Sequence, residues 1–184
     1  FSLFLALGAF WAFSARADFI GQRVNFSIDP GYDNQGRSEA TATMMALSNK
    51  AYFYIDEDWW NALDQSKQAE AKKSLEDLAE EFDKKIYPTL TAAYGSEWRP
   101  GIDGDERITV LFHLLKENAA GYFSTGNEYP KAQNSQSNER EMVYLNTNKI
   151  GSPLVKSYLA HEFTHLITFF QKDQLRGVAE EIWL

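Results

Sequence analysis

The chain has 184 residues, of which 44% are hydrophobic and 15% aromatic, enough apolar side chain to bury one substantial core. Its formal net charge of −8 argues against a nucleic-acid-binding surface, because phosphate recognition uses clustered Lys and Arg. There is no cysteine, so disulfides and thiolate ligands are excluded, and any metal ion must be held by His and carboxylate side chains.

Two features at the N-terminus indicate a secretion signal. The sequence opens with the apolar run "FSLFLALGAFWAF", and Ala15-Arg16-Ala17 then has the small-x-small form of a signal-peptidase site. We therefore interpret residues 1–17 as the remnant of a signal and residues 18–184 as the folded domain. The alternative is that the run is a core strand or helix; it is too short to predict a stable membrane span.

The first half of the chain predicts strands followed by a helix. Residues 22–29 alternate apolar and polar side chains, as a half-buried strand does, and residues 40–56 predict two strands joined at 48–50. From residue 57 the pattern becomes helical. The spacing predicts one apolar helix face made by Leu75, Leu78, Ala79, Phe82 and Ile86, with Glu80–Lys84 and Glu81–Lys85 pairs on the other.

Breaker residues bound the elements that follow. Pro88 is expected to end or kink the helix, and Gly95 to close the segment after it. Residues 107–115 predict a strand with Ile108, Val110, Phe112 and Leu114 on one face. His113 falls on the other face, and we assign it a structural role without a metal, because a lone strand histidine is usually a core residue with satisfied hydrogen bonds.

The next elements lead to the most informative stretch. Residues 141–146, "EMVYLN", predict another short strand, and the whole order is typical of an α+β fold. Ser152 and Pro153 then have the character of a cap and a first helical residue. The helix that they predict contains "SYLAHEFTHLITFF".

Two imidazoles share one face of this helix. At about 100° per residue, His161 and His165 lie roughly 40° apart, so both rings can reach a single ion. The opposite face is apolar and is expected to anchor the helix in the core; it comprises Leu159, Phe163, Leu166 and Phe170. If the two histidines on this helix had no partner, removing their rings from water would cost free energy. A metal ion supplies that partner.

Glu162 lies beside the first histidine, close enough to contact a water that the ion binds. The pattern therefore predicts Zn²⁺ held by His161 and His165, with Glu162 as the catalytic base. Two core histidines satisfied by ordinary hydrogen bonds would give the same five-residue pattern. The capped helix and its apolar back face favour zinc.

The motif "HEFTH" resembles the gluzincin form of the HExxH zinc peptidases, and "EMVYLN" followed by "YLAHEFTHLI" is similar in layout to thermolysin-like enzymes. The resemblance is closer to the hyicolysin family of bacterial secreted peptidases, through "AYFYIDEDWW", "IDGDERITVLF", "AGYF", "EMVYLN", "LAHEFTHLITF" and "EEIWL", over about residues 24–184. It implies a secreted or cell-surface zinc endopeptidase. It also implies the N-terminal subdomain of a zincin fold, with a twisted mixed sheet and the active-site helix, truncated before the C-terminal helical subdomain.

The third zinc ligand is less well determined. A metzincin would need Gly at position 168 and His at position 171, and this chain has Thr168 and Gln171. The gluzincin resemblance implies a Glu from the next helix, which we expect just beyond Leu184, with Glu181 or Glu180 as the fallback within the chain.

A peptide or protein substrate is expected to bind as an added strand along a sheet edge, and "AAGYFSTGN" is the candidate for that edge. Calcium is a weaker expectation, because "DPGYDNQGR" and "GIDGDER" are acidic but lack the spacing of an EF-hand loop. Two other functions stay open: a non-catalytic binding module that kept the fold, and a zinc hydrolase of a non-peptide substrate.

Overall fold

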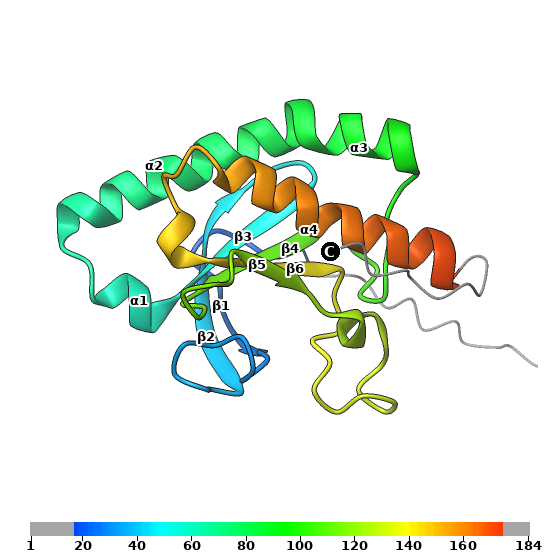
Figure 1. Ribbon diagram of the computed structural model, residues 1–184, viewed down its shortest axis with the longest axis horizontal. Coiled ribbons are helices and arrows are strands. Elements are labelled where there is room, and N and C mark those ends of the chain that lie inside the picture. The colour runs from blue at the N-terminus through cyan, green and yellow to red at the C-terminus, as the bar shows by residue number, and fades with distance from the viewer. Residues whose placement is uncertain (1–16, 175–184) are drawn as a thin grey trace, which may run out of the picture.

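The computed structural model describes residues 17–174 and shows a six-stranded mixed β-sheet with helices on one face (Figure 1). The strands are β1 (Arg23–Ser27), β2 (Glu39–Leu47), β3 (Ala51–Asp56), β4 (Ile108–His113), β5 (Gly121–Phe123) and β6 (Met142–Asn146). Their order across the sheet is β1-β2-β3-β4-β6-β5. The β1–β2 and β2–β3 pairs are antiparallel, β3–β4 and β4–β6 are parallel, and β5 returns antiparallel to β6 at the edge.

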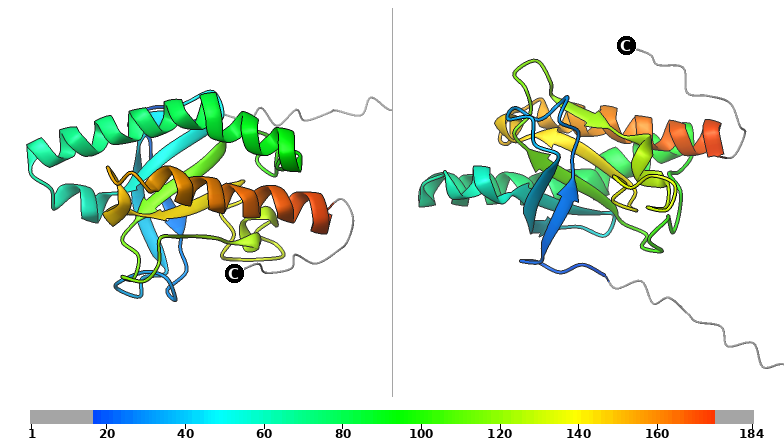
Figure 2. Two further views of the ribbon diagram at one scale, coloured as in Figure 1. Left: turned by 45° about the horizontal axis from the view of Figure 1, so that its top comes forward. Right: turned by 90° about the horizontal axis from the view of Figure 1, so that it is seen from below.

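The described residues also form four α-helices and several short helical turns. They are α1 (Glu57–Asn61), α2 (Gln65–Glu81), α3 (Tyr87–Tyr94) and α4 (Val155–Phe169), with π turns at Phe82–Ile86 and Phe170–Gln174 and short 3₁₀ turns at Thr125–Glu128 and Thr147–Lys149. Figure 2 shows α2, α3 and α4 on the same side of the sheet. Among the described residues, no helix is long and apolar enough to cross a membrane.

The strand predictions for the first half are confirmed. Residues 48–50 connect β2 to β3, and both strands lie within the expected range. β2 alternates between buried and more exposed residues, whereas β3 does not, because β3 is buried on both faces. Phe53 and Ile55 pack toward the helices, whereas Tyr52 and Tyr54 belong to a second apolar cluster on the opposite face.

The predicted helix face is also confirmed. Leu75, Leu78, Ala79, Phe82 and Ile86 all lie in the core between the helices and the sheet. Glu80 pairs with Lys84, and Glu81 with Lys85. The α-helical hydrogen bonding changes to a π turn directly before Tyr87 and Pro88, and Gly95 ends α3 with a φ of 91°.

The helix that carries the motif begins later than expected. Ser152 accepts a hydrogen bond from the Leu154 N–H in a turn, and α4 starts at Val155 without a side-chain cap. Leu159, Phe163 and Leu166 are buried as predicted. Phe170 is only half-buried and stacks on Trp98, because α4 gives way to a π turn there and Phe169 takes the core position instead.

Glu128 and Glu141 are buried acids outside the motif that have unpartnered carboxylate oxygens. Glu128 and Glu141 are each 2% exposed, and both carboxylate oxygens of Glu128 and one of Glu141 have no partner among the described residues. Burial raises the pKa of both groups, and the negative charge of Glu141 raises the pKa of Glu128 further. Glu128 is therefore neutral in the folded protein at neutral pH.

We predict that Glu128→Gln stabilises the protein at pH 8 and has little effect at pH 4. The unfolded chain releases this proton near the ordinary Glu pKa of 4.5, whereas the folded protein retains it, so the wild type loses stability as pH rises above that value. Melting temperatures across pH 4–9 test this. Glu117→Gln, an exposed loop substitution, is the control, and equal pH profiles for Glu128→Gln and the wild type would contradict the prediction.

Candidate active site

Helix α4 brings the two motif histidines together at the surface. The His161 Nε2 and His165 Nε2 atoms lie 3.1 Å apart, and the two rings meet edge to face with centroids 4.7 Å apart. His161 is exposed and His165 half-buried. Burial lowers the pKa of His161, and the adjacent His165 lowers it further. A depressed histidine pKa keeps the ring neutral, which is the form that ligates metals.

The distance between the two ring nitrogens suits a shared zinc ion. With Zn–N bonds of about 2.0–2.1 Å in a tetrahedral site, two nitrogen ligands lie about 3.3–3.4 Å apart, close to the separation of the His161 and His165 Nε2 atoms. Within residues 17–174, no group of three or more His, Asp or Glu side chains gathers around a point that would suit a metal. The expected third ligands, Glu180, Glu181 or a residue beyond Leu184, lie outside the described residues. For the same reason, no group of carboxylates that could hold calcium is found within residues 17–174.

Gln171 stands at the position where a metzincin would have a histidine ligand. Its Nε2 donates to the Ser96 carbonyl oxygen over 2.7 Å, and its amide group packs closely against Gly95. Gln171 therefore fastens the end of α4 to the segment after α3.

Glu162 is buried under the strand at the sheet edge. Only 6% of this residue is exposed. Burial raises the pKa of its carboxyl group to about 7, although the nearby His165 acts in the opposite direction and lowers it. The close neighbour is Gly121 of β5, where an added Cβ would lie 2.9 Å from both Cγ and Oε1 of Glu162 and 2.7 Å from the Tyr144 carbonyl oxygen. A larger residue at 121 would therefore collide with the carboxylate.

An open cleft of about 640 Å³ lies between α4, the segment that leads into the start of β5, and the β1–β2 loop. Its walls include Tyr32, Gly121, Tyr158, His161 and Glu162. Sequence analysis identified the last two and included Gly121 in the expected substrate edge, which the structure places as the edge strand β5, but it gave no role to Tyr32 or Tyr158. A glycine beside an aromatic pair was the only signal at Gly121, and its meaning depends on the approach of α4, which no local pattern encodes.

Asn146 at the end of β6 holds the segment that leads into β5. Its Nδ2 donates to the Ala119 carbonyl oxygen over 2.8 Å, and its backbone N–H donates to the Ala120 carbonyl oxygen over 3.0 Å. Backbone groups alternate in direction along an antiparallel strand. Ala120 and Tyr122 thus direct their backbone groups toward β6, which leaves those of Gly121 and Phe123 on the free edge.

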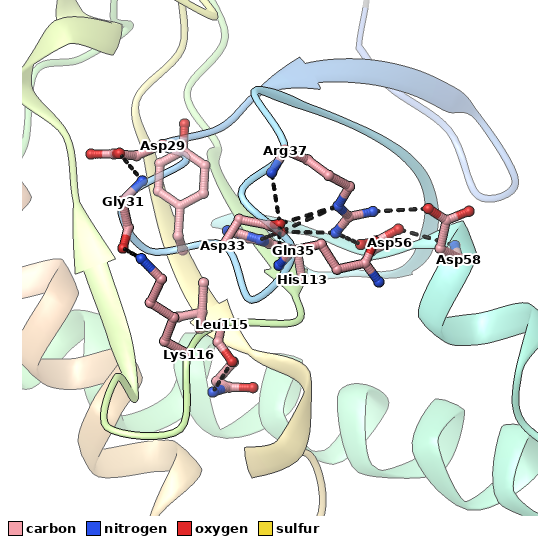
Figure 3. A network of polar contacts seen from close by, with 12 residues as sticks. Asp29, Gly31, Asp33, Gln35, Arg37, Asp56, Asp58, His113, Leu115 and Lys116 are labelled. Carbon is pink, nitrogen blue, oxygen red and sulfur yellow. Dashed lines mark hydrogen bonds and ion pairs between the residues drawn. The ribbon is translucent and has the colours of Figure 1, made fainter.

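His113 lies in a polar network on the opposite side of the sheet from α4 (Figure 3). Its Nδ1 and Nε2 atoms lie 3.2 Å from Asp33 Oδ2 and from the Tyr122 hydroxyl, respectively. Burial lowers the pKa of His113 despite the nearby Asp33, so a neutral ring donates to the carboxylate and accepts from the hydroxyl. These contacts agree with the structural role predicted for His113.

Asp33 fixes the loop between β1 and β2. It accepts hydrogen bonds from the backbone N–H groups of Gln35 and Arg37 and pairs with the Arg37 guanidinium, which also contacts Asp56 and Asp58 (Figure 3). Burial alone would raise the pKa of Asp33, but these donors outweigh it and lower the pKa to about 2. The loop that carries Tyr32 to the cleft is therefore held by an ionised, fully buried carboxylate.

Comparison with known proteins adds one relationship. The chain is 26% identical over 126 aligned residues to the neutral metalloprotease ShpI of Staphylococcus hyicus, an alignment that covers 61% of this chain and 28% of that protein. The chain thus spans less than a third of the length of that relative. No family model matches the sequence. The similarity supports a relationship to metallopeptidases.

We predict that Gly121→Ala destabilises the protein by about 1–3 kcal/mol, because the new methyl group overpacks the contact with Glu162. In a Glu162→Ala background the cost should be smaller, since part of the collision is removed while the contact with the Tyr144 carbonyl oxygen remains. Urea unfolding of the wild type, both single variants and the double variant measures this coupling. The same cost in both backgrounds would show that Glu162 does not limit the space at Gly121.

Proposed function

We propose that the protein is a zinc-dependent endopeptidase of the HExxH type, with His161 and His165 as metal ligands and Glu162 as general base. The observation that carries the proposal is the approach of the two Nε2 atoms to 3.1 Å at the wall of a cleft, beside a buried carboxylate. The similarity to a metalloprotease supports the same reaction class. We further propose the gluzincin type, a hyicolysin-like relationship, export from the cell and a third ligand from a Glu that follows α4.

When bound, zinc would polarise the scissile carbonyl and lower the pKa of its water toward about 7. Glu162 takes a proton from the attacking water at a carboxylate oxygen and passes it to the leaving amine nitrogen. The raised pKa of Glu162 suits both steps, because a carboxylate whose pKa lies close to the surrounding pH accepts a proton readily and releases it again. His161 and His165 would hold the ion and would take no proton.

The free edge of β5 is the proposed binding site for the peptide backbone. Gly121 and Phe123 offer N–H and C=O groups that no described strand pairs with, and Gly121 lies directly against Glu162. A peptide added antiparallel to β5 would therefore pass the catalytic carboxylate in an extended conformation. This mode uses backbone hydrogen bonds and demands little of the peptide sequence.

We predict that His161→Ala and His165→Ala each abolish tight zinc binding, since a single histidine cannot hold the ion against a chelator. Metal content after dialysis, measured on the full chain by elemental analysis, tests this. His113→Gln is the matched control, because it removes the third histidine of the sequence, whose ring contacts Asp33 and Tyr122 on the opposite side of the sheet from His161 and His165. Retention of one zinc per molecule by both alanine variants would refute the metal assignment.

Glu162→Gln should keep the zinc and the fold but lower kcat for a quenched fluorescent peptide by at least about 100-fold, because the amide preserves the shape and cannot accept a proton. Zinc occupancy is matched before rates are compared. Undiminished turnover would place the base elsewhere. A wild-type protein that binds zinc but cleaves no peptide would favour a non-catalytic module or a hydrolase of another substrate.

A further inference from the structure

Three tyrosine rings form a continuous stack that ends at the cleft. Tyr144 of β6 and Tyr122 of β5 are parallel with centroids 4.1 Å apart, and Tyr32 from the β1–β2 loop stacks on the other face of Tyr122 at 4.4 Å. These spacings are close to the separation of neighbouring strands, about 4.7–4.9 Å. Tyr32 therefore lies about one strand spacing beyond β5, on the side of the sheet away from α4.

The outer part of Tyr32 is accessible, whereas its support is rigid. Tyr32 is 42% exposed and lines the same cleft as His161 and Glu162, while Tyr122 beneath it is buried. A tyrosine held on one face by another ring presents its remaining surface as a flat apolar patch with a polar tip. No other aromatic side chain that lines this cleft lies on the side away from α4.

Backbone and side-chain contacts fix Tyr32 in this position. Its carbonyl oxygen accepts from the Lys116 N–H over 2.9 Å, and Lys116 Nζ donates to the Gly31 carbonyl oxygen over 2.5 Å. Asp33, the next residue, forms a β-bridge with Leu115 and anchors the loop through Arg37. A wall that is ordered before the ligand arrives loses little entropy on binding, which is what a specificity site requires.

We infer that Tyr32 is a specificity-determining residue that packs against an aromatic or large aliphatic side chain of the peptide, on the face directed away from α4. The inference rests on the proposed function. In an extended peptide beside β5, side chains alternate between the face of α4 and the face of Tyr32. Tyr32 fills the place opposite Tyr122 on its face, so the side chains that it selects are those of the same face that flank this place, and the positions directed toward α4 are not selected.

The test uses the full chain loaded with zinc and a set of quenched peptides in which each residue near the scissile bond is Phe or Ala in turn. For the wild type we expect kcat/KM to favour Phe by at least about fivefold at one position or at two positions of the same face separated by three residues, consistent with an aromatic contact. Tyr32→Ala should bring that ratio close to one, and Tyr32→Phe should preserve it. Tyr94→Ala removes an exposed tyrosine of α3 outside the cleft and should leave the ratio unchanged.

Binding provides a second measurement that does not depend on turnover. In the Glu162→Gln background, the dissociation constant of the preferred Phe peptide should rise by at least about threefold on Tyr32→Ala, while that of its Ala counterpart stays nearly constant. Melting temperatures and zinc content show whether Tyr32→Ala remains folded. Tyr32→Phe tests the role of the ring even if Tyr32→Ala does not fold.

Each outcome has a separate meaning. An unchanged Phe/Ala ratio in Tyr32→Ala, or a ratio that rises because bulky residues now enter, would overturn the inference and leave the proposed peptidase activity intact. A ratio lost equally in Tyr32→Phe would also overturn it, since the ring would not be the determinant. A zinc-loaded wild type without any cleavage would overturn the proposed function and the inference together.

Discussion

The contact between Glu162 and Gly121 is the constraint on which the candidate site depends. The apolar back face of α4 fixes how deeply the helix sits on the sheet, and at that depth the Glu162 carboxylate meets the backbone of β5. Only a residue without a side chain leaves room for it. Because Glu162 is buried by this contact, its neighbour His161 is turned outward into the cleft, so one packing interaction positions both the proposed base and one of the proposed metal ligands.

The two edges of the sheet differ in a way that fits this arrangement. On β1 the outer positions Arg23 and Asn25 are exposed and polar, which discourages another strand from pairing there. On β5 the short segment from Gly121 to Phe123 carries no charge, and Gly121 at its start lines the cleft. Strand addition is therefore favoured at the edge beside the candidate site and disfavoured at the other.

Sequence patterns predicted the parts of this protein that depend on local periodicity. The strand pair around residues 48–50, the apolar face of α2 and the pairing of His161 with His165 on one helix face all follow from side-chain repeats of two or about four residues. Features that depend on which elements meet in space were missed. Gly121 and Tyr32 gained their meaning only from the approach of α4 and of the β1–β2 loop to β5, and the start of α4 shifted because Ser152 caps a turn instead.

Three buried carboxyl groups show how the surroundings decide the chemistry of one functional group. Asp33 has an arginine and two backbone N–H donors, which keep it ionised and make it an anchor for the loop. Among the described residues, the carboxylate oxygens of Glu128 have no hydrogen-bond partner and Glu141 lies nearby, so Glu128 stays protonated. Glu162 lies between these extremes: burial raises its pKa to about 7, while the cleft leaves one side open. Of the three, only Glu162 combines a pKa near neutrality with access to a cleft, and a group that must both take up and release a proton during one turnover requires both properties.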